Sequence, residues 1–225
     1  MEEKKLIATA RITGLWYLLL AISGVLGFMI FHSQIYISTD PEKTLTNLIN
    51  LSSTSRIRLL LELVIIISQA LAAVWFYKLF KEINGWAAWA TGVWGMMNAG
   101  AIMISAISMS ASIEIANSAS QSFQEKVVLI QLSGSLISNA WGVGSIFFGL
   151  WLIPMGFVVA ESKRMPVWLG RVLMIGGIGY LLSTFIKYAG FSNPLFELLV
   201  IPATVGEFWM IAYLLIYGIR PAAGK

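Results

Sequence analysis

The sequence predicts an all-α fold, a polytopic transmembrane helix bundle of six spans with both termini in the cytoplasm. Of its 225 residues, 58% are hydrophobic and 12% are charged, and the mean hydropathy is +0.80. An ordinary soluble domain has about 25% charged residues, so this chain has too few polar side chains to cover a water-soluble globule. Long uncharged runs also recur along the chain. Each is close to the ~20 residues that a helix needs to cross ~30 Å of hydrocarbon.

Six such runs are expected to be spans, and together they form one predicted integral membrane domain, residues 1–225. The N-terminal run resembles a signal peptide, but it continues to Phe31 without a small-residue cleavage site, so we expect it to remain as the first span. The fourth run is long enough for a helix that is tilted or that begins outside the bilayer. The predicted spans cover about 12–31, 57–77, 86–109, 130–159, 167–186 and 197–217.

The basic residues predict the orientation, because the cytoplasmic loops of membrane proteins carry an excess of Lys and Arg. Most of the fifteen basic residues lie at the termini, in the connections 78–85 and 160–166, or at the adjoining span ends. This distribution predicts that both termini lie in the cytoplasm. The inner set is Lys4, Lys5, Arg11, Lys78, Lys81, Lys163, Arg164, Arg171, Arg220 and Lys225, and the outer set is Lys43, Arg56, Arg58, Lys126 and Lys187.

The first outer connection has a helical signal of its own, "TDPEKTLTNLINL". Asp40 stands where a helix cap is favoured, and Pro41 follows in the first turn. We predict a short amphipathic helix over about 40–51 that lies on the outer membrane surface. The alternative is a solvated loop with a few apolar residues. The apolar face would consist of Leu45, Leu48 and Ile49.

Stripes of small and polar residues predict the faces through which spans three and four pack. Helices associate in lipid through close packing of small side chains and through interhelical hydrogen bonds. A helix–helix seam is the simpler interpretation of both stripes, and a polar pathway is the alternative. The stripes are Asn98, Ala101, Ser105, Ser108 and Ser112 in span three, and Gln131, Ser135, Ser138, Gly142, Ser145 and Gly149, with Asn139 at the edge, in span four.

The second span carries charge on one face. Arg58, Glu62 and Gln69 lie at i, i+4 and i+11, with Arg58 at the outer boundary and Glu62 about one turn deeper. An i, i+4 ion pair is geometrically natural there. If it is wet, we expect it to contribute about 1 kcal/mol or less. The pair either anchors the span or belongs to a functional interior.

Glu207 interrupts the sixth span, "VIPATVGEFWMIAYLL". A carboxylate at the bilayer centre costs ~2.5–3.5 kcal/mol by insertion scales, and such residues usually face the bundle interior. Pro202 frees a backbone carbonyl nearby and Gly206 lets another helix come close, which is typical of a binding or proton site. The alternative is a structural glutamate that donates a hydrogen bond. We expect Glu207 to be protonated and to contact amide or hydroxyl groups of spans two, three or four.

Several kinds of site are excluded by the composition. The chain has no cysteine, which excludes disulfides and thiolate metal sites, and its single histidine, His32, excludes a multi-histidine metal cage. The glycines of "IGGIGYLL" follow no strand, so they do not form a phosphate-binding loop. Glu62 and Glu207 alone are weak evidence for a divalent cation. We therefore expect no cofactor, no metal ion, no catalytic residue and no nucleic-acid partner.

Three stretches carry a family resemblance: "ARITGLWYLLLAISGVLG" (10–27), "FFGLWLIPMGFVVAESKRMPVWLGRVLMIGGIGYLL" (147–182) and "IPATVGEFWMIAYLLIYG" (201–218). They are similar to a bacterial family of multi-pass membrane proteins that is described as a domain of unknown function. That family commonly has a histidine where Trp151 stands and an arginine where Val93 stands, and this chain has neither. The resemblance covers nearly the whole chain. It implies an integral protein of the bacterial cytoplasmic membrane and no particular activity.

Three functional hypotheses follow. The first is a small transporter or permease-like protein for a small-molecule or ion substrate. The second is a non-catalytic membrane component that binds lipid or a protein partner, either alone or as a homo-oligomer. The third, an intramembrane enzyme, is disfavoured because no nucleophile, metal cage or cofactor motif accompanies the acid. The candidate intramembrane site is Glu207, Glu62, Gln69, Arg58, Asn98 and Asn139, with a helix break at Pro202 and Gly206.

Overall fold

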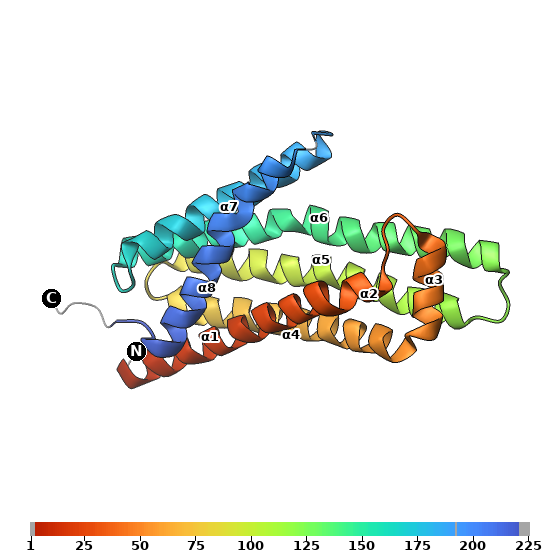
Figure 1. Ribbon diagram of the computed structural model, residues 1–225. Coiled ribbons are helices and arrows are strands. Elements are labelled where there is room, and N and C mark those ends of the chain that lie inside the picture. Colours follow the sequence, from red (N-terminus) through yellow and green to blue (C-terminus); the bar gives the residue numbers. More distant parts are fainter. Residues whose placement is uncertain (1–2, 192, 221–225) are drawn as a thin grey trace. The chain divides into compact units, whose positions relative to one another are not determined.

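The computed structural model describes residues 3–191 and 193–220, and every regular element in these ranges is a helix (Figure 1). Helix α1 (Glu3–Val25) runs into a π-helical segment, η1 (Leu26–His32), and then into the short α2 (Ser33–Ile35). The elements that follow are α3 (Pro41–Asn50), α4 (Ser52–Phe80), α5 (Gly85–Asn117), α6 (Phe123–Ser162), α7 (Val167–Tyr188), the 3-10 helix η2 (Pro194–Val200) and α8 (Ile201–Ile216).

Within residues 3–191 and 193–220, six helical stretches are long and apolar enough to cross a membrane. The predicted all-α, six-span fold is therefore confirmed. The orientation of the spans stays a prediction, and Lys225, which belongs to the inner set of basic residues, lies outside the described residues. The stretches are Lys4–Ile35, Ser52–Phe80, Gly85–Asn117, Phe123–Ser162, Val167–Tyr188 and Pro194–Ile216.

Helix α6 is longer than a bilayer requires. It has 40 residues and continues through Pro154. At 1.5 Å per residue, such a helix is ~60 Å long, about twice the ~30 Å of the hydrocarbon core. Tilt alone cannot absorb this excess at the usual ~20°, so we infer that one end of α6 projects beyond the bilayer.

The described residues form two compact units that share the longer helices. Unit 1 contains Met1–Leu18, Ser68–Asn98 and Ser145–Lys225, and unit 2 contains Leu19–Ile67 and Ala99–Gly144. Helices α1, α4, α5 and α6 each contribute one segment to each unit. The prediction of a single domain stays a prediction.

Unit 1 is built on faces where glycine lets helices come close. A Cβ atom added to Gly149 would lie 2.6 Å from the carbonyl oxygen of Gly177, and one added to Gly156 would lie 2.5 Å from that of Gly170. Helices α6 and α7 therefore meet backbone to backbone. Helices α7 and α8 also pack along each other (Figure 1). Such small-residue contacts are a main source of helix association in lipid.

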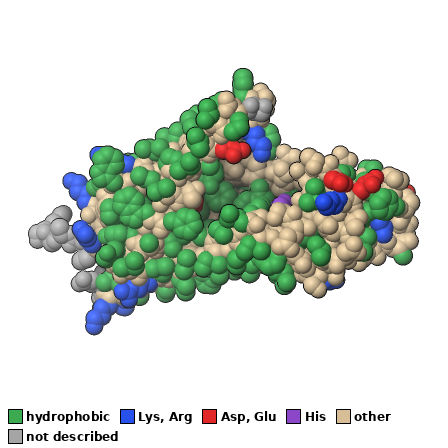
Figure 2. All heavy atoms as spheres, viewed as in Figure 1, with side chains coloured by type: hydrophobic (Ala, Val, Ile, Leu, Met, Phe, Trp, Pro, Cys, Tyr) green, Lys and Arg blue, Asp and Glu red, His purple; other side chains and the backbone are tan. Residues whose placement is uncertain are grey.

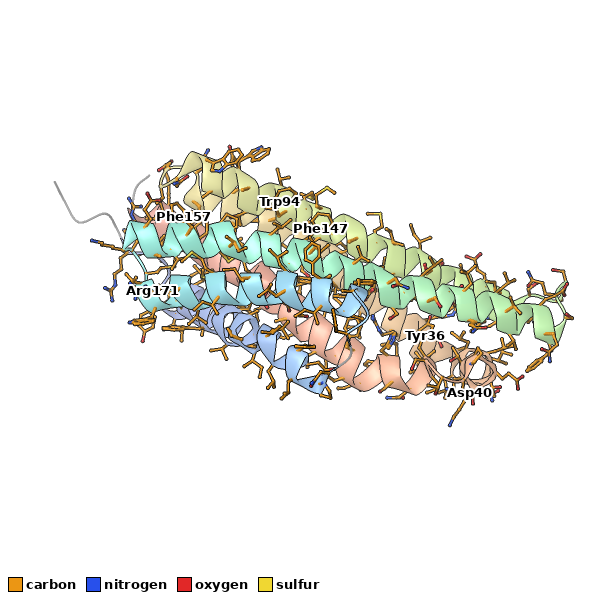
Figure 3. The ribbon with its side chains drawn as sticks, turned by 90° about the horizontal axis from the view of Figure 1, so that it is seen from above. Tyr36, Asp40, Trp94, Phe147, Phe157 and Arg171 are labelled. Carbon is orange, nitrogen blue, oxygen red and sulfur yellow. The ribbon has the colours of Figure 1, made fainter. Side chains whose placement is uncertain are left out.

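Aromatic side chains fill the interior of unit 1. The ring of Tyr17 lies 5.5 Å from that of Phe76 and 5.2 Å from that of Trp151, measured between centroids. Trp94 of α5 and Phe147 of α6 stack at 6.2 Å and extend this packing between neighbouring helices (Figure 3). Phe76 of α4 and Trp151 of α6 thus hold the ring of Tyr17 from two other helices.

Unit 2 contains the predicted amphipathic helix. The side chain of Asp40 accepts a hydrogen bond from the backbone of Lys43 at 2.8 Å, so both the helix and its N-terminal cap are confirmed. Figure 1 shows that α3 runs across the direction of the longer helices of this unit. Leu45 and Leu48 are buried, but Ile49 is 47% exposed and does not join them. The location of α3 at a membrane surface stays a prediction.

Candidate functional site

Arg58 and Glu62 form an ion pair in unit 2. Nη1 of Arg58 donates to Oε2 of Glu62 at 2.8 Å, and both side chains are fully buried. The predicted i, i+4 pair therefore forms, and because it is buried, the value given for a wet pair does not apply to it. The location of Arg58 at the outer membrane boundary stays a prediction. The i, i+4 spacing on α4 identified the partners, but the residues that cover them come from other helices.

Glu62 is held by those other helices as well. The indole Nε1 of Trp141, on α6, donates to Oε1 of Glu62 at 2.9 Å and also approaches Oγ of Ser105, on α5, at 3.2 Å. Each carboxylate oxygen of Glu62 thus accepts a hydrogen bond. Three helices of unit 2 meet at this buried acid.

The guanidinium of Arg58 is enclosed by the π-helical segment η1. Its carbon lies 4.7 Å from the centroid of the Phe28 ring, which is a cation–π distance. A Cβ atom on Gly27 would lie 3.3 Å from Nη1 of Arg58, so glycine at this position leaves room for the guanidinium. Nε and Nη2 of Arg58 are buried and have no hydrogen-bond acceptor among the described residues.

A recess of about 360 Å³ lies in unit 2 beside this cluster. His32 and Tyr36 line it and stack on each other with their centroids 4.9 Å apart. The His32 side chain, purple in Figure 2, can be seen from outside, and Figure 3 shows Tyr36 before the start of α3. Burial raises the pKa of Tyr36 to about 12.

Part of the predicted small-residue stripe of α6 also lines this recess. Gln131, Ser135 and Ser138 are exposed there together with Asn139. The seam that we predicted for the whole stripe is therefore wrong for this half. The stripe packs against another helix at Gly149, in unit 1.

Glu207 lies in unit 1 and contacts another span. Its Oε1 accepts a hydrogen bond from the hydroxyl of Tyr17 at 2.7 Å. Tyr17 is almost completely buried, and Glu207 is partly buried. The partner comes from α1, not from spans two, three or four as expected. We expected an amide or hydroxyl group from the polar stripes of those spans, whereas a tyrosine combines an apolar ring with a hydroxyl that reaches farther.

The remaining predicted site residues of unit 1 have contacts of their own. Nε2 of Gln69 donates to the backbone oxygen of Gly95 at 3.2 Å. The amide of Asn98 is fully buried and has no hydrogen-bond partner among the described residues. Pro202 stands in the first turn of α8, where η2 ends, so the expected helix break is a change from 3-10 to α-helix. A Cβ atom on Gly206 would lie 2.9 Å from the side chain of Leu173, and Gly206 therefore brings α8 close to α7.

The predicted site is thus divided between the two units. Unit 2 contains the Arg58–Glu62 pair and Asn139, and unit 1 contains Gln69, Asn98 and Glu207. The residues that sequence reasoning missed are aromatic or imidazole side chains whose polar atoms become visible only after packing: Tyr17, His32, Tyr36 and Trp141. Among the described residues, no group of three or more His, Asp or Glu side chains could hold a metal ion.

The chain matches a family model over residues 12–218, almost its whole length, and that model is DUF4386, a domain of unknown function. The chain belongs to the DUF4386 family. A protein of Archaeoglobus fulgidus, described as an uncharacterized protein, is 30% identical to this DUF4386 chain over 69 residues. The aligned part is 31% of the chain and 43% of that relative, so the chain spans less than half of the relative's length. No solved structure matches the chain.

Proposed function

We propose that this DUF4386 chain is a small transporter or permease-like protein of the bacterial cytoplasmic membrane. The supporting observation is the Arg58–Glu62 pair, which is fully buried in a chain of apolar helices and lies beside a polar recess. Ionisable residues are expensive inside a membrane and usually mark a pathway or a binding site. A buried ion pair is also no more stabilising than well-packed apolar residues. A functional role therefore explains it better than stability does.

Glu207 supplies a second ionisable group, suited to carry a proton. Its carboxyl group accepts a hydrogen bond from the neutral hydroxyl of Tyr17. No ion pair of Glu207 is found among the described residues. Burial without a cation favours the neutral acid over the carboxylate. A group that loses its proton only when its surroundings change is what proton-coupled transport requires.

Lipid binding by a non-catalytic component is the second candidate, and a feature of unit 1 favours it. Lys5, Lys78 and Lys81 line a recess of about 460 Å³ together with Trp75 and one acidic residue, Glu82. Figure 2 shows Lys and Arg side chains gathered at this end of unit 1. Basic residues beside an interfacial aromatic residue attract anionic headgroups. Under this hypothesis the buried polar residues only specify how the helices pack.

Transport by reconstituted protein distinguishes these candidates. The purified chain is placed in liposomes that contain a trapped pH dye, and small solutes, anions first, are added outside. We expect a solute-dependent change of internal pH that is lost in Glu207→Gln and retained in Glu42→Gln, a matched change at an exposed carboxylate. Folded protein that moves no solute and no protons, but binds anionic vesicles through Lys78 and Lys81, would favour the lipid-binding component.

A further inference from the structure

We propose that the side edge of Arg58, formed by Nε and Nη2, binds a small oxyanion, a carboxylate or phosphate group, inside unit 2. This inference deepens the proposed function, because it names the class of solute that the transporter would carry. It rests on that function only for the transport step. Binding of the anion can be measured whether or not transport occurs.

The donor geometry of Arg58 supports this proposal. A guanidinium has five N–H donors in one plane, and Nε and Nη2 point their N–H bonds in parallel from one side. Nη1 is occupied by Glu62 at 2.8 Å. The side edge is buried and has no acceptor among the described residues. Two parallel N–H groups match the two oxygens of a carboxylate or phosphate.

Glu62 satisfies only one nitrogen of Arg58. Its Oε2 accepts from Nη1, and its Oε1 accepts from the indole N–H of Trp141 instead of from the side edge of Arg58. Buried N–H donors of a charged group are costly when they have no acceptor. The two oxygens of a carboxylate or phosphate can accept one hydrogen bond each from Nε and Nη2, in the parallel geometry that these donors favour.

The π-helical segment η1 shapes the space around the guanidinium. In an α-helix, residues five apart such as Gly27 and His32 would point about 140° away from each other. A π turn hydrogen-bonds residue i to residue i+5 and brings such positions closer to one face. Gly27 thereby faces Nη1, Cζ and Nε of Arg58, and His32 reaches the recess. Single π turns occur frequently at functional sites.

The recess lies next to a side chain that covers Arg58. His32 lines the recess, and its ring lies 5.5 Å from that of Phe28, whose ring faces the guanidinium carbon of Arg58 at 4.7 Å. Amide and hydroxyl groups of Gln131 and Ser135, on α6, line the opposite wall. A volume of about 360 Å³ suits a small polar molecule. The same phosphate chemistry could come from a free anion or from a lipid headgroup, and the experiment must separate the two sources.

The test is binding by the full-length chain in nanodiscs of zwitterionic lipid. Acetate and inorganic phosphate are titrated, and the melting temperature and tryptophan fluorescence are followed. We expect either anion to raise the melting temperature, since a ligand that binds only the folded state stabilises it. Arg58→Lys keeps the charge but loses the two-pronged edge, so we expect the affinity to fall ~tenfold or more. Arg56→Lys, at an exposed position on the same helix, is the control and should change nothing.

A glycine pair keeps the proposal testable if Arg58→Lys does not fold. Gly27→Ala adds a methyl group 3.3 Å from Nη1 and 3.7 Å from Nε of Arg58, whereas Gly24→Ala adds one with nothing within 4 Å. We expect Gly27→Ala to weaken anion binding several-fold and Gly24→Ala to leave it unchanged. Equal affinities in both variants, or no anion effect in the wild type, would overturn the proposal.

Lipid composition then identifies the source of the oxyanion. If nanodiscs with phosphatidylglycerol raise the melting temperature of the wild type but not of Gly27→Ala, while free anions have no effect, the edge binds a lipid headgroup. If free anions bind and the liposomes show no transport, the oxyanion site stands and the transporter proposal fails. If Arg58→Lys transports solute as fast as the wild type, the transporter proposal stands and the oxyanion site fails.

Discussion

At the scale of single residues, the Arg58–Glu62 pair is the least ordinary feature of the molecule. Both side chains are fully buried. Removing one partner of a buried ion pair leaves an uncompensated charge and typically costs ~3–5 kcal/mol. Replacing both partners by apolar residues of similar volume is often neutral or stabilising. Stability and function therefore make different demands on these two positions.

A double replacement exploits this difference. We expect Glu62→Leu alone to lower the free energy of unfolding by ~3–5 kcal/mol, and Arg58→Met together with Glu62→Leu to recover most of that loss. Equilibrium unfolding in detergent mixtures measures both values. The double variant should be folded but unable to bind the oxyanion. If the double variant is as unstable as the single one, the ion pair itself stabilises the fold and apolar residues cannot replace it.

The Tyr17–Glu207 hydrogen bond gives a second prediction. Tyr17→Phe removes the hydroxyl that donates to Glu207 at 2.7 Å, and losing a partner of a buried polar group costs ~1–3 kcal/mol. Tyr217→Phe is a matched control, because Tyr217 is exposed. Glu207→Gln should keep the fold, and Glu207→Leu should cost a similar ~1–3 kcal/mol. Strictly additive losses in Tyr17→Phe with Glu207→Leu would show that the two residues do not interact.

At the scale of helices, the glycine faces of α6 and α7 decide how closely these elements meet. In Gly156→Ala the new methyl group would lie 2.5 Å from the carbonyl oxygen of Gly170, so backbone must move. We expect a loss of ~1–3 kcal/mol or more from overpacking. Gly134→Ala, on the same helix, meets nothing within 4 Å. It should be neutral or gain up to ~1 kcal/mol from helix propensity. Thermal unfolding of the two variants measures the contrast.

The helices were also the part that the sequence predicted best. Length and apolarity are properties of one segment, so six spans and the Asp40 cap could be derived without knowing any neighbour. The partners of Arg58 and Glu207 depend on which helices meet, and spacing within one helix carries no such information. That is why the i, i+4 pair was found but its covering residues, Phe28 and Trp141, were not.

The same limit applies to η1. The local run "LGFMIFH" contains one glycine and no proline, and neither fact distinguishes a π turn from an α turn. Accommodation of the buried guanidinium beside Gly27 is a tertiary effect. The predicted seam on α6 failed for a related reason, since Gln131 and Ser135 face a recess instead of a neighbouring helix.

At the scale of the whole molecule, the orientation in the membrane is the main prediction that still needs a measurement. The chain has no cysteine, so single cysteines can be added without background. A cysteine at Ser162, where α6 ends, should react with an impermeant thiol reagent only from the cytoplasm. One at Ser120, between α5 and α6, should react only from outside. Reaction from the opposite sides would invert the predicted topology.

The π-helical segment η1 also predicts how the sequences of family members differ at this position. A π turn fits one more residue into a helix than an α turn does. We infer that one residue was inserted in Leu26–His32, the π-helical segment. Members of DUF4386 that lack this residue would align with a one-position gap here and would form an uninterrupted α-helix. The gap and the arginine at position 58 should then exclude each other across the family. An alignment of family sequences would thus show which members have the residues of the proposed anion site and which lack them.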